Sequence, residues 1–450
     1  MKLPLTEKLK NLACACPFPL YVVGGYVRDS LAGLKSENCD MDICAPVSAD
    51  EFCGAAKKCG ATVNAVYRNT GTVKLSLDGG EYEFASFRSD EYVRGVHNPV
   101  KTFFTDDIYL DARRRDFKCN AVYYDIKAES FADPLGGIAD IESRRISTVA
   151  DAEKVFGEDG LRLMRLARQS AQTGFAPTQD CLDGARRNAK LISDCSAERV
   201  YAELNLILHA DEKYGVKYAQ YQGLKILDDT RVLDEILPEL TLGRGMVQRA
   251  EFHYHDVLEH SLRAVKYADK SVRLAALMHD IGKPYSMKER GNFHGHELDS
   301  EKISLEVLHR LKAPKKLADE VAKLAALHMY DFSLDAREIK VRRFIVRNLP
   351  YLDKLLLLKQ ADFSACRDNL SEAPTVTKWK AIYKKMREEC APFDLKGLAV
   401  RGNELIAAGV PAVKTGDLLQ MLLEECAVNP SYNNKQALIK RALSLCAVKG

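Results

Sequence analysis

Short apolar runs alternate with turn residues along the first third of the chain. The runs are rich in β-branched and aromatic residues, and most are bounded by Gly, Asp or Asn, which is typical of strands. They predict strands near 21–25, 41–45, 72–77, 81–87 and 121–126. Helical spacing of apolar positions predicts two helices among them, at 6–14 and 27–34. We therefore expect a small α+β unit with a mixed sheet and helices on one side.

From about residue 150 the spacing of apolar positions becomes helical. The stretch 158–175 is amphipathic and ends at Gly174, and the stretch 196–210 begins with Ser196 as a helix N-cap. A histidine-rich helical block follows, and prolines interrupt the helices after it. The predicted fold class is α+β, in four parts: a mixed-sheet head at 1–145, a helical neck and body at 146–245, a third domain at 246–370 and a helical C-terminal tail at 371–450.

Composition narrows the class of protein. A hydrophobic share of 46% and a charged share of 29% are ordinary for a soluble globular chain. No apolar run is long enough for a membrane helix, and the first 12 residues lack the hydrophobic core of a signal peptide. The 13 cysteines are an odd number without a CxxC pair, which favours reduced thiols. We therefore expect a cytoplasmic protein without membrane contact.

Net charge is +3, which is too small to indicate a nucleic-acid partner by itself. If RNA binds, the positive charge must be local, and the arginine clusters at 113–115 and 162–168 are among the candidates. Each cluster alone is also what a solvated helix face requires. Charge therefore leaves the partner open.

Two carboxylates, Asp40 and Asp42, stand two residues apart in a predicted buried strand. Side chains at i and i+2 of a strand point to the same face, while Met41 and Ile43 would pack into the core. Adjacent anions repel unless a cation lies between them, and Mg²⁺ prefers a few carboxylates together with substrate phosphates. Two such ions, roughly 3.5–4 Å apart, would activate a hydroxyl and stabilise a leaving pyrophosphate. We expect both aspartates to be catalytic Mg²⁺ ligands.

A glycine pair precedes the predicted helix at 27–34. Gly24 and Gly25 would let backbone amides approach phosphates, and a helix N-terminus favours anions. Arg28 would lie near that end as a phosphate clamp. A lone DxD is more often a loop or capping cluster, but the glycine turn at this upstream spacing favours a platform for nucleotidyl transfer.

Four motifs, in order, carry a resemblance to a known family: "GGYVRD" with "DMD", "RRRDFKCNAVYYD" at 113–125, "DPLGGIAD" at 133–140 and "EDGLRLMRLAR" at 158–168. They resemble the class II tRNA nucleotidyltransferases, which are the CCA-adding enzymes and the related bacterial poly(A) polymerases. The resemblance covers residues 20 to about 210 and continues more weakly beyond. It implies a nucleotidyltransferase head with a polymerase β-like palm, and tRNA, CTP and ATP as partners.

The resemblance also implies roles for the RRDFxxNA motif. Arg114, Arg115 and Asn120 would handle the triphosphate and the ribose, and Asp116 would accept a hydrogen bond from a ribose hydroxyl. Arginines beside an acid suit a polyanion next to a sugar diol. A surface salt-bridge cluster is the alternative. Glu83 occupies a strand where this superfamily often has a third acid, although a glutamate that faces water is an equal interpretation.

The motif at 158–162 places Glu158 and Asp159 ahead of Arg162. Asp159 and Arg162 are at i and i+3, so they are expected to share one helical face and to address the Watson–Crick edge of cytosine or adenine. In the family this motif acts as a protein template, and Arg165 continues the same side. An intrahelical ion pair is the alternative. The loop at 92–99 departs from the family's acidic pattern, which puts the switch from C to A addition in doubt.

The histidine-rich block contains an H…HD…D order. It resembles an HD-domain phosphohydrolase, with a two-metal site for Mn, Fe, Ni or Co in addition to the Mg²⁺ of the head. In some family members such a domain acts as a phosphatase or cyclic phosphodiesterase, so phosphorylated RNA ends are expected substrates. An inert HD fold is the alternative. The expected ligands are His260, His279, Asp280, His296, His328 and Asp362.

The leading hypothesis follows from the resemblance. The chain would transfer CMP and AMP from CTP and ATP to the tRNA 3′ end without a nucleic-acid template and would release pyrophosphate. A poly(A) polymerase or an enzyme that adds only A is a close alternative. An HD hydrolase with an RNA-binding N-terminal module is an alternative of another class, against which Asp40, Asp42 and the EDxxR motif argue. The sequence leaves the oligomeric state open.

Overall fold

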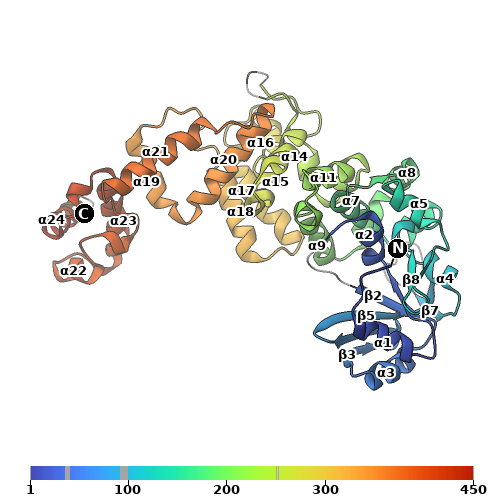
Figure 1. Ribbon diagram of the computed structural model, residues 1–450. Helices are drawn as coiled ribbons and strands as arrows, with labels where there is room; N and C mark the ends of the chain where they lie inside the picture. The colour runs from blue at the N-terminus through green and yellow to red at the C-terminus, as the bar shows by residue number, and fades with distance from the viewer. Residues whose placement is uncertain (1, 36–40, 92–99, 250, 252, 449–450) are drawn as a thin grey trace. The chain divides into compact units, whose positions relative to one another are not determined.

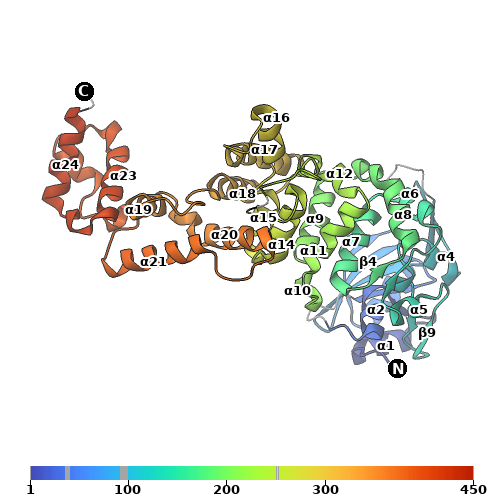
Figure 2. The same ribbon diagram turned by 90° about the horizontal axis from the view of Figure 1, so that it is seen from above.

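The structure is a computed structural model that describes residues 2–35, 41–91, 100–249, 251 and 253–448. The chain forms two compact units: an N-terminal unit of Met1–Thr241 with Arg310–Ala313, and a C-terminal unit of Leu242–His309 with Pro314–Gly450 (Figures 1 and 2). Among the described residues, no helix combines the length and apolar character that crossing a membrane requires. The four-part division at 145, 245 and 370 stays a prediction.

The N-terminal unit is built on a mixed seven-stranded sheet in the order β3-β4-β5-β2-β1-β8-β9. β2 and β5 run parallel, while the other neighbouring pairs run antiparallel. The predicted mixed sheet is confirmed. Its strands are β1 (Tyr21–Val23), β2 (Met41–Ala45), β3 (Thr62–Tyr67), β4 (Thr72–Leu77), β5 (Gly80–Ser86), β8 (Tyr123–Asp125) and β9 (Ser130–Ala132).

Several strands carry no buried apolar run, and the sequence pattern missed them. β3 is an edge strand on which every residue is at least partly exposed, so its side chains need not alternate. β6 (Arg88–Glu91) pairs with β7 (Lys101–Phe104) in a separate ribbon whose side chains are also partly or fully exposed. β10 (Arg145–Ile146) and β11 (Ala176–Pro177) form a short parallel pair.

Helices cover this sheet and extend beyond it. α2 contacts β1 and β2, and α3 contacts β3, β4 and β5 (Figure 1). The helices of the unit, with two 3₁₀ turns η1 (Lys118–Asn120) and η2 (Ala189–Asp194), are α1 (Glu7–Ala15), α2 (Gly25–Ala32), α3 (Ala49–Lys58), α4 (Ile108–Arg113), α5 (Gly137–Glu142), α6 (Ala152–Glu158), α7 (Leu161–Thr173), α8 (Gln179–Asn188), α9 (Ala197–Leu208), α10 (Asp211–Tyr214), α11 (Ala219–Asp229), α12 (Val232–Ile236) and α13 (Pro238–Thr241).

α7 is the central helix of the helical part. Its apolar side packs against α9 and α11, and Met164, Leu166 and Ala167 are fully buried. The helix ends where expected, because Gly174 adopts a left-handed conformation with φ of 70°. Because α7 packs against these helices on one side, the arginines on its other side can contact residues of the head.

The C-terminal unit is helical among its described residues. α14, α15 and α20 pack against one another, and α15 also contacts α18 (Figure 2). The unit contains the 3₁₀ turns η3 (Lys270–Val272), η4 (Leu349–Tyr351), η5 (Leu395–Gly397) and η6 (Pro430–Tyr432) and the helices α14 (Val257–Tyr267), α15 (Arg273–Met278), α16 (Lys283–Arg290), α17 (His296–Arg310), α18 (Lys315–Leu327), α19 (Glu338–Arg347), α20 (Leu352–Arg367), α21 (Pro374–Glu388), α22 (Gly402–Ala407), α23 (Ala412–Val428) and α24 (Lys435–Val448).

Candidate functional site

Strand β2 presents a carboxylate to the solvent side of the sheet. Met41 and Ile43 are buried as expected, whereas Asp42 between them is exposed. In the parallel pairing, Asp42 lies opposite Glu83 of β5, so both side chains face the same way. Asp40, the other predicted Mg²⁺ ligand, lies outside the described residues. The structure therefore places one member of the predicted pair.

The glycine turn brings the start of α2 against Asp42. Gly24 has φ of 84°, a conformation that side chains rarely adopt, and a Cβ there would lie 3.1 Å from Oδ2 of Asp42. α2 begins at Gly25, two residues before the predicted start, because the weak helix propensity of glycine hides the true first turn. Absence of a side chain at Gly24 thus permits this turn to lie close to Asp42. The predicted approach of its backbone amides to phosphates stays a prediction.

Arg28 belongs to a buried polar network rather than to the protein surface. Its side chain is 6% exposed, and Nε donates a hydrogen bond to Oδ1 of Asp29 at 2.8 Å. Nη1 donates to Oδ1 of Asn120 at 2.8 Å and to Oε1 of Gln169 at 3.1 Å. Gln169 was not predicted, although it follows Arg165 by four residues and therefore shares its side of α7.

Asp116 is the buried acid of the same network. Arg165 donates to its Oδ2 from Nε at 2.9 Å and from Nη2 at 2.7 Å, and Asn120 donates to its Oδ1 at 3.0 Å. Burial favours the neutral acid, but Arg165 and Asn120 outweigh it and hold the pKa of Asp116 well below its ordinary value. In this structure the carboxylate orients protein donors. Its contact with a ribose hydroxyl stays a prediction.

Arg114 and Arg115 are both held by Asp111, a residue that the sequence analysis missed. Nε of Arg114 donates to one carboxylate oxygen at 2.8 Å, and Nη2 of Arg115 donates to the other at 3.2 Å. The Tyr123 hydroxyl donates to the second oxygen as well, at 2.6 Å. Burial alone would raise the pKa of Asp111, but the two arginines lower it to about 2. The spacing of i, i+3 and i+4 from this acid is the signal that predicts it.

The EDxxR motif does not lie on one helix, so the predicted shared helical face of Asp159 and Arg162 is wrong. α6 ends just before Asp159, which has extended backbone angles of φ −150° and ψ 106°. Its Oδ1 accepts a hydrogen bond from the Leu161 N–H at 2.9 Å and so caps α7. Gly160 forms the joint between the helices, since a Cβ there would lie 2.4 Å from a backbone oxygen of η2.

Arg162 is anchored by its neighbours at the start of α7. Its guanidinium donates to the carbonyl oxygens of Val155 at 2.9 Å and Arg114 at 2.7 Å, and to Oε2 of Glu158 at 2.8 Å. The ion pair within the motif is therefore between Glu158 and Arg162. Contact with the backbone of Arg114 links the two arginine-bearing motifs directly.

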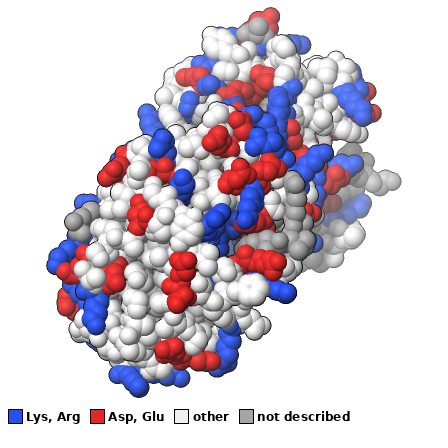
Figure 3. Space-filling view, turned by 90° about the vertical axis from the view of Figure 1, so that its right-hand side faces the viewer, with Lys and Arg blue, Asp and Glu red and all other residues white. Residues whose placement is uncertain are grey.

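These side chains surround one cavity of about 650 Å³ in the N-terminal unit. Every predicted nucleotide-binding residue except Glu158 lines this cavity, and so does Asp42. On the face seen in Figure 3, basic and acidic residues are interspersed. The cavity lining includes nine basic and five acidic residues, so basic residues outnumber acidic ones there. The lining also includes basic side chains that were not assigned from the sequence: Arg88, Arg168, Arg199 and Lys213.

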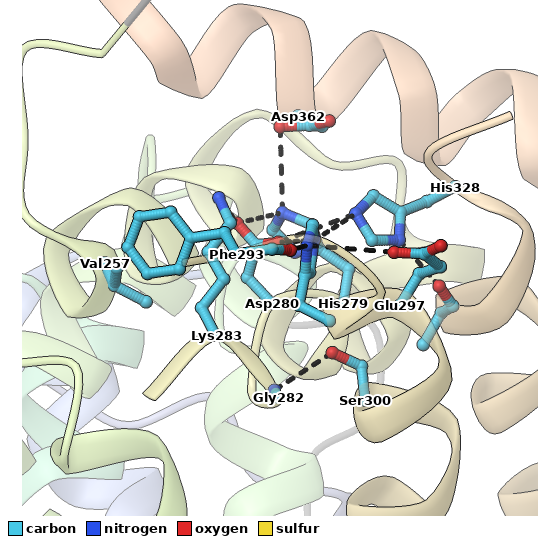
Figure 4. A network of polar contacts seen from close by, with 12 residues as sticks. Val257, His279, Asp280, Gly282, Lys283, Phe293, Glu297, Ser300, His328 and Asp362 are labelled. Carbon is cyan, nitrogen blue, oxygen red and sulfur yellow. Dashed lines mark hydrogen bonds and ion pairs between the residues drawn. The ribbon is translucent and has the colours of Figure 1, made fainter. Parts of the chain in front are cut away.

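The C-terminal unit gathers all six predicted HD residues in its interior. His260 lies on α14, His279 and Asp280 follow α15, and Asp362 lies on α20. His296 opens α17, and His328 follows the last turn of α18. None of the six is more than 7% exposed. Figure 4 shows the labelled members of the group with their side chains turned toward one another.

Asp280 lies at the middle of this cluster. Its Oδ2 is 3.3 Å from Nε2 of His260 and 3.2 Å from Nε2 of His279. Its Oδ1 is 3.0 Å from Nε2 of His296 and 3.5 Å from Nε2 of His328. The carboxylate thus joins two pairs of imidazoles. Asp362 completes the first pair, with Oδ1 at 3.1 Å from His260 and 3.6 Å from His279.

Three of the imidazole rings are oriented in the same way. Nδ1 of His279, His296 and His328 lies 2.7, 2.7 and 2.6 Å from the carbonyl oxygen three residues earlier. This contact holds the proton on Nδ1 and leaves Nε2 to bind a cation. Imidazole nitrogens with the carboxylates of Asp280 and Asp362 fit a transition-metal centre by the chemistry of the donors.

Charge in the cluster favours cation binding. Burial raises the pKa of both carboxyls, but the surrounding imidazoles, together with Lys283 at Asp280, hold the pKa of Asp280 and of Asp362 well below the ordinary value. Burial lowers the pKa of His279, but the two carboxylates outweigh it and raise that pKa to about 10. In this structure the Nζ of Lys283 lies 2.6 Å from Oδ2 of Asp280. A divalent cation would compete for the same carboxylate.

Three protein families match separate parts of the chain. The poly A polymerase head domain matches residues 20–147, and the HD domain matches residues 257–355. A third family, the probable RNA and SrmB-binding site of polymerase A, matches residues 174–242. The three matches do not overlap, and together they include most of the predicted site residues.

The relatives differ in how much of their length matches this chain. The A-adding tRNA nucleotidyltransferase of Deinococcus radiodurans is 29% identical over 441 residues, which is 92% of this chain and 93% of that protein. The CCA-adding enzyme of Geobacillus kaustophilus is 35% identical over 191 residues, which is 42% of this chain and 46% of that enzyme. The chain thus spans about half the length of the CCA-adding relatives it matches.

Solved structures share the fold over nearly the whole chain. The Bacillus stearothermophilus CCA-adding enzyme in complex with CTP has a TM-score of 0.66 and 21% identity, with 99% of both chains covered. The Thermotoga maritima CCA-adding enzyme complexed with tRNA has a TM-score of 0.60 and 18% identity, with 98% of this chain and 96% of that chain covered.

The mixed sheet with an exposed acid beside an arginine-lined cavity lies in the part of the chain that matches the poly A polymerase head domain, and the histidine cluster lies mostly in the part that matches the HD domain. The chain is similar to tRNA nucleotidyltransferases, as its motifs predicted.

Proposed function

We propose that this chain transfers CMP and AMP from CTP and ATP to the 3′ end of tRNA, releases pyrophosphate and completes the CCA sequence. The observation that carries the proposal is the cavity in which Asp42 meets the arginines of three separate motifs. Its positive lining suits a nucleoside triphosphate and an RNA backbone at once. CCA-adding relatives and fold neighbours support the same reaction.

The residues of the cavity divide into three roles under this proposal. Asp42, with Asp40, would hold Mg²⁺, which when bound supplies charge neutralisation for the phosphates. Arg114 and Arg115, held by their buried acid, would bind phosphate oxygens without a large loss of side-chain entropy. The tRNA 3′-hydroxyl would attack the α-phosphorus, and pyrophosphate would leave.

Base selection would fall to Asp159 and the arginines beside it. Asp159 lines the cavity from the joint between two helices, and Arg162 and Arg165 line it from α7. Hydrogen-bond donors and an acceptor at fixed positions favour the edges of cytosine and adenine. Uracil or guanine would leave buried polar groups unpaired, which lowers their incorporation.

Nucleotide incorporation on tRNA that ends before CCA tests the proposal. We expect CMP addition with CTP alone and completion of CCA when ATP is added. We expect Asp42→Ala to lower incorporation by roughly 10³-fold, because a metal ligand at the reacting phosphate is lost. Asp180→Ala is the matched control, since that aspartate is exposed on α8 away from the cavity. Full activity of Asp42→Ala would refute the assignment.

The alternative activity is the addition of A alone, and the same assay tests it. It is favoured by one observation: the relative matched over 93% of its length is an A-adding enzyme. A substrate series of tRNA ending in no C, one C or two C separates the two activities. Incorporation of AMP on the last substrate, without any CMP addition on the first two, would replace CCA addition by A addition.

We propose phosphoester hydrolysis as a second activity, in the HD domain. The convergence of imidazoles on Asp280 within a cavity of about 730 Å³ favours it. Mn, Co, Ni or Fe would be held by the six predicted ligands and, when bound, would supply Lewis-acid polarisation of a phosphoryl oxygen. Phosphorylated RNA ends are the expected substrate class.

Hydrolysis of 2′,3′-cyclic nucleotides and of p-nitrophenyl phosphate tests this second activity. The full chain is supplied with Mn²⁺, Co²⁺ or Ni²⁺ after treatment with a chelator. We expect Asp280→Asn to lose hydrolysis and to keep nucleotide incorporation. Asp319→Asn, at an exposed position of α18, is the control that should keep both. An absence of hydrolysis with every ion would mean that the HD fold is inert.

A further inference from the structure

Two potential metal ligands beside the HD centre, His253 and Cys366, have no role in the proposed function. One ligand atom each of His253, His260 and Cys366 lie within 4.8 Å of one another. Cys366 is a free thiol one helical turn beyond Asp362 on α20, and it is 8% exposed. His260 belongs to both groups of side chains.

The two nitrogens of His260 have different surroundings. Nε2 faces the HD carboxylates, 3.1 Å from Asp362. Nδ1 is buried and has no hydrogen-bond partner among the described residues, in a ring that is 0% exposed. The other HD imidazoles differ, because Nδ1 of each contacts a backbone carbonyl. A buried imidazole nitrogen without a partner is unfavourable, so its surroundings point to a missing ligand.

His253 repeats the same feature. Its Nδ1 is also buried without a hydrogen-bond partner in the described part of the chain. Its ring meets that of His260 edge to face, with 4.8 Å between ring centroids. The backbone fixes this segment, since the Tyr254 N–H donates to the carbonyl oxygen of Cys366 at 3.0 Å. His253 is therefore held against the C-terminal end of α20 by a direct contact.

We propose that His253, His260 and Cys366 bind one zinc ion at a site separate from the HD centre. A thiolate and two imidazoles are typical zinc ligands, and three protein ligands leave a fourth position for water. The thiolate makes this set softer than the imidazole and carboxylate set next to it. Simple packing of a thiol against two rings would leave two buried nitrogens unpaired, whereas a metal ion satisfies both.

The site would give His260 two functions. With zinc on Nδ1 and no ion in the HD centre, Nε2 would keep its proton and donate it to Asp362. With an ion in the HD centre as well, the ring would release that proton and join the two ions as an imidazolate. Zinc would also connect the segment before α14 with α14 and α20. Because His253 lines the HD cavity, this connection would stabilise one wall of it.

Cobalt binding to the full chain tests the proposal, because Co²⁺ replaces Zn²⁺ and its bond to a thiolate gives a charge-transfer band in the near ultraviolet. We expect the band in the chelator-treated chain on titration with Co²⁺, and its loss on addition of Zn²⁺. Cys366→Ser should remove the band and lower the cobalt capacity by one ion per chain. Cys426→Ser, at a fully buried cysteine of α23, should change neither. No band in the wild type, or a band that survives in Cys366→Ser, would overturn the site.

Two further variants distinguish loss of the proposed zinc site from loss of the HD ion and from misfolding. Asp280→Asn removes an HD ligand, and the band should persist. Its disappearance there would assign the thiolate to the HD ion and refute a separate site. His253→Ala changes a side chain outside the helices, so we expect a folded protein with at least tenfold weaker zinc binding in competition with a chelator. Unchanged zinc affinity in His253→Ala would also refute the proposal.

Discussion

The nucleotidyltransferase cavity is lined by guanidinium groups, whereas the HD cluster consists of imidazoles around carboxylates. At the cavity, Asp116 in its lining and Asp111 beside it are buried acids that orient arginines. In the HD cluster Asp280 and Asp362 face imidazole nitrogens, a type of atom that commonly binds transition-metal cations. The same residue type therefore has two uses: one site is arranged for an incoming anion, and the other is arranged for an incoming cation.

This difference determines how each site responds to the loss of an acid. Removal of an acid from the cavity leaves an arginine without its counter-charge, so both stability and substrate binding suffer. Removal of an acid from the HD cluster leaves the imidazoles, and at Asp280 also Lys283, with less counter-charge, and it removes a metal ligand as well. The variants below distinguish these two responses, and they are ordered by the size of the expected effect.

Asp116→Asn should have the largest effect on the cavity. Because Asp116 is buried while Arg165 keeps access to water, we expect the free energy of unfolding to fall by about 3 kcal/mol at neutral pH. The lowered pKa of Asp116 makes its contribution present above the ordinary value of 3.8 and lost as the pH falls below it. Urea unfolding between pH 7 and pH 3 should show the difference from wild type shrink with acidity. Asp180→Asn is the exposed control, and a difference independent of pH would contradict the assignment.

His328→Gln should affect metal-dependent stability but not incorporation of nucleotides. At a metal concentration of 100 Kd, Mn²⁺ or Co²⁺ should stabilise the wild-type C-terminal unit by about 2.7 kcal/mol. Loss of this ligand should weaken metal binding by roughly 10–100-fold and remove about half of the shift or more. His309→Gln, at an exposed position of α17, should keep it. Equal metal-induced shifts in the two variants would remove His328 from the centre.

Gly24→Ala should act on the cavity through backbone conformation. Both Gly24→Ala and Gly33→Ala place a side chain at positive φ, and this strain lowers the free energy of unfolding by about 1 kcal/mol or more in each variant. Gly24→Ala also places Cβ 3.1 Å from Asp42, whereas Gly33 has no atom within 4 Å of its Cβ position. We expect roughly tenfold lower incorporation in the first variant alone, measured as kcat. Equal activities would mean that this approach to Asp42 is not needed for the reaction.

Glu83→Gln should have the smallest effect. Glu83 is exposed and forms an ion pair with Lys74 at 3.7 Å, so its charge is shared with solvent and with a lysine. We expect incorporation to change by less than about threefold, because an exposed pair contributes little. Single-turnover incorporation of CMP is the measurement. A loss of more than tenfold would make Glu83 a third acid of the catalytic group.

Much of the fold follows from local pattern. Strands with a buried apolar run, such as β2 and β4, were predictable, and so was the end of α7 at Gly174. β3 was not, because an exposed edge strand imposes no alternation on its side chains. The family motifs located the cavity residues. The H…HD…D order located the cluster of histidines and aspartates, since helix packing brings together histidines far apart in sequence.

The features that the sequence did not predict depend on tertiary contacts, which the spacing of apolar residues along the chain does not indicate. The joint at Gly160 exists because η2 packs too closely for a side chain, and this contact puts Asp159 outside the helix. Asp111 and Gln169 gained their roles from arginines that fold onto them. The helical spacing of Asp111 from Arg114 and Arg115 was a signal for its role. Gln169 had no such signal for its contact, because the arginine that donates to it, Arg28, lies 141 residues earlier in the sequence.

Strand pairing also sets the order in which the nucleotidyltransferase head can be assembled. β1 lies between β2 and β8, and its partner in β8 comes about one hundred residues later, with Tyr21 opposite Asp125. Closure over such a distance is slow and cannot begin until the later strand has left the ribosome. Because the arginine motif at 113–115 precedes β8, a nascent chain shorter than 113 residues holds the acid-bearing strand without Arg114 and Arg115. Competence for the reaction is therefore a late event in biosynthesis.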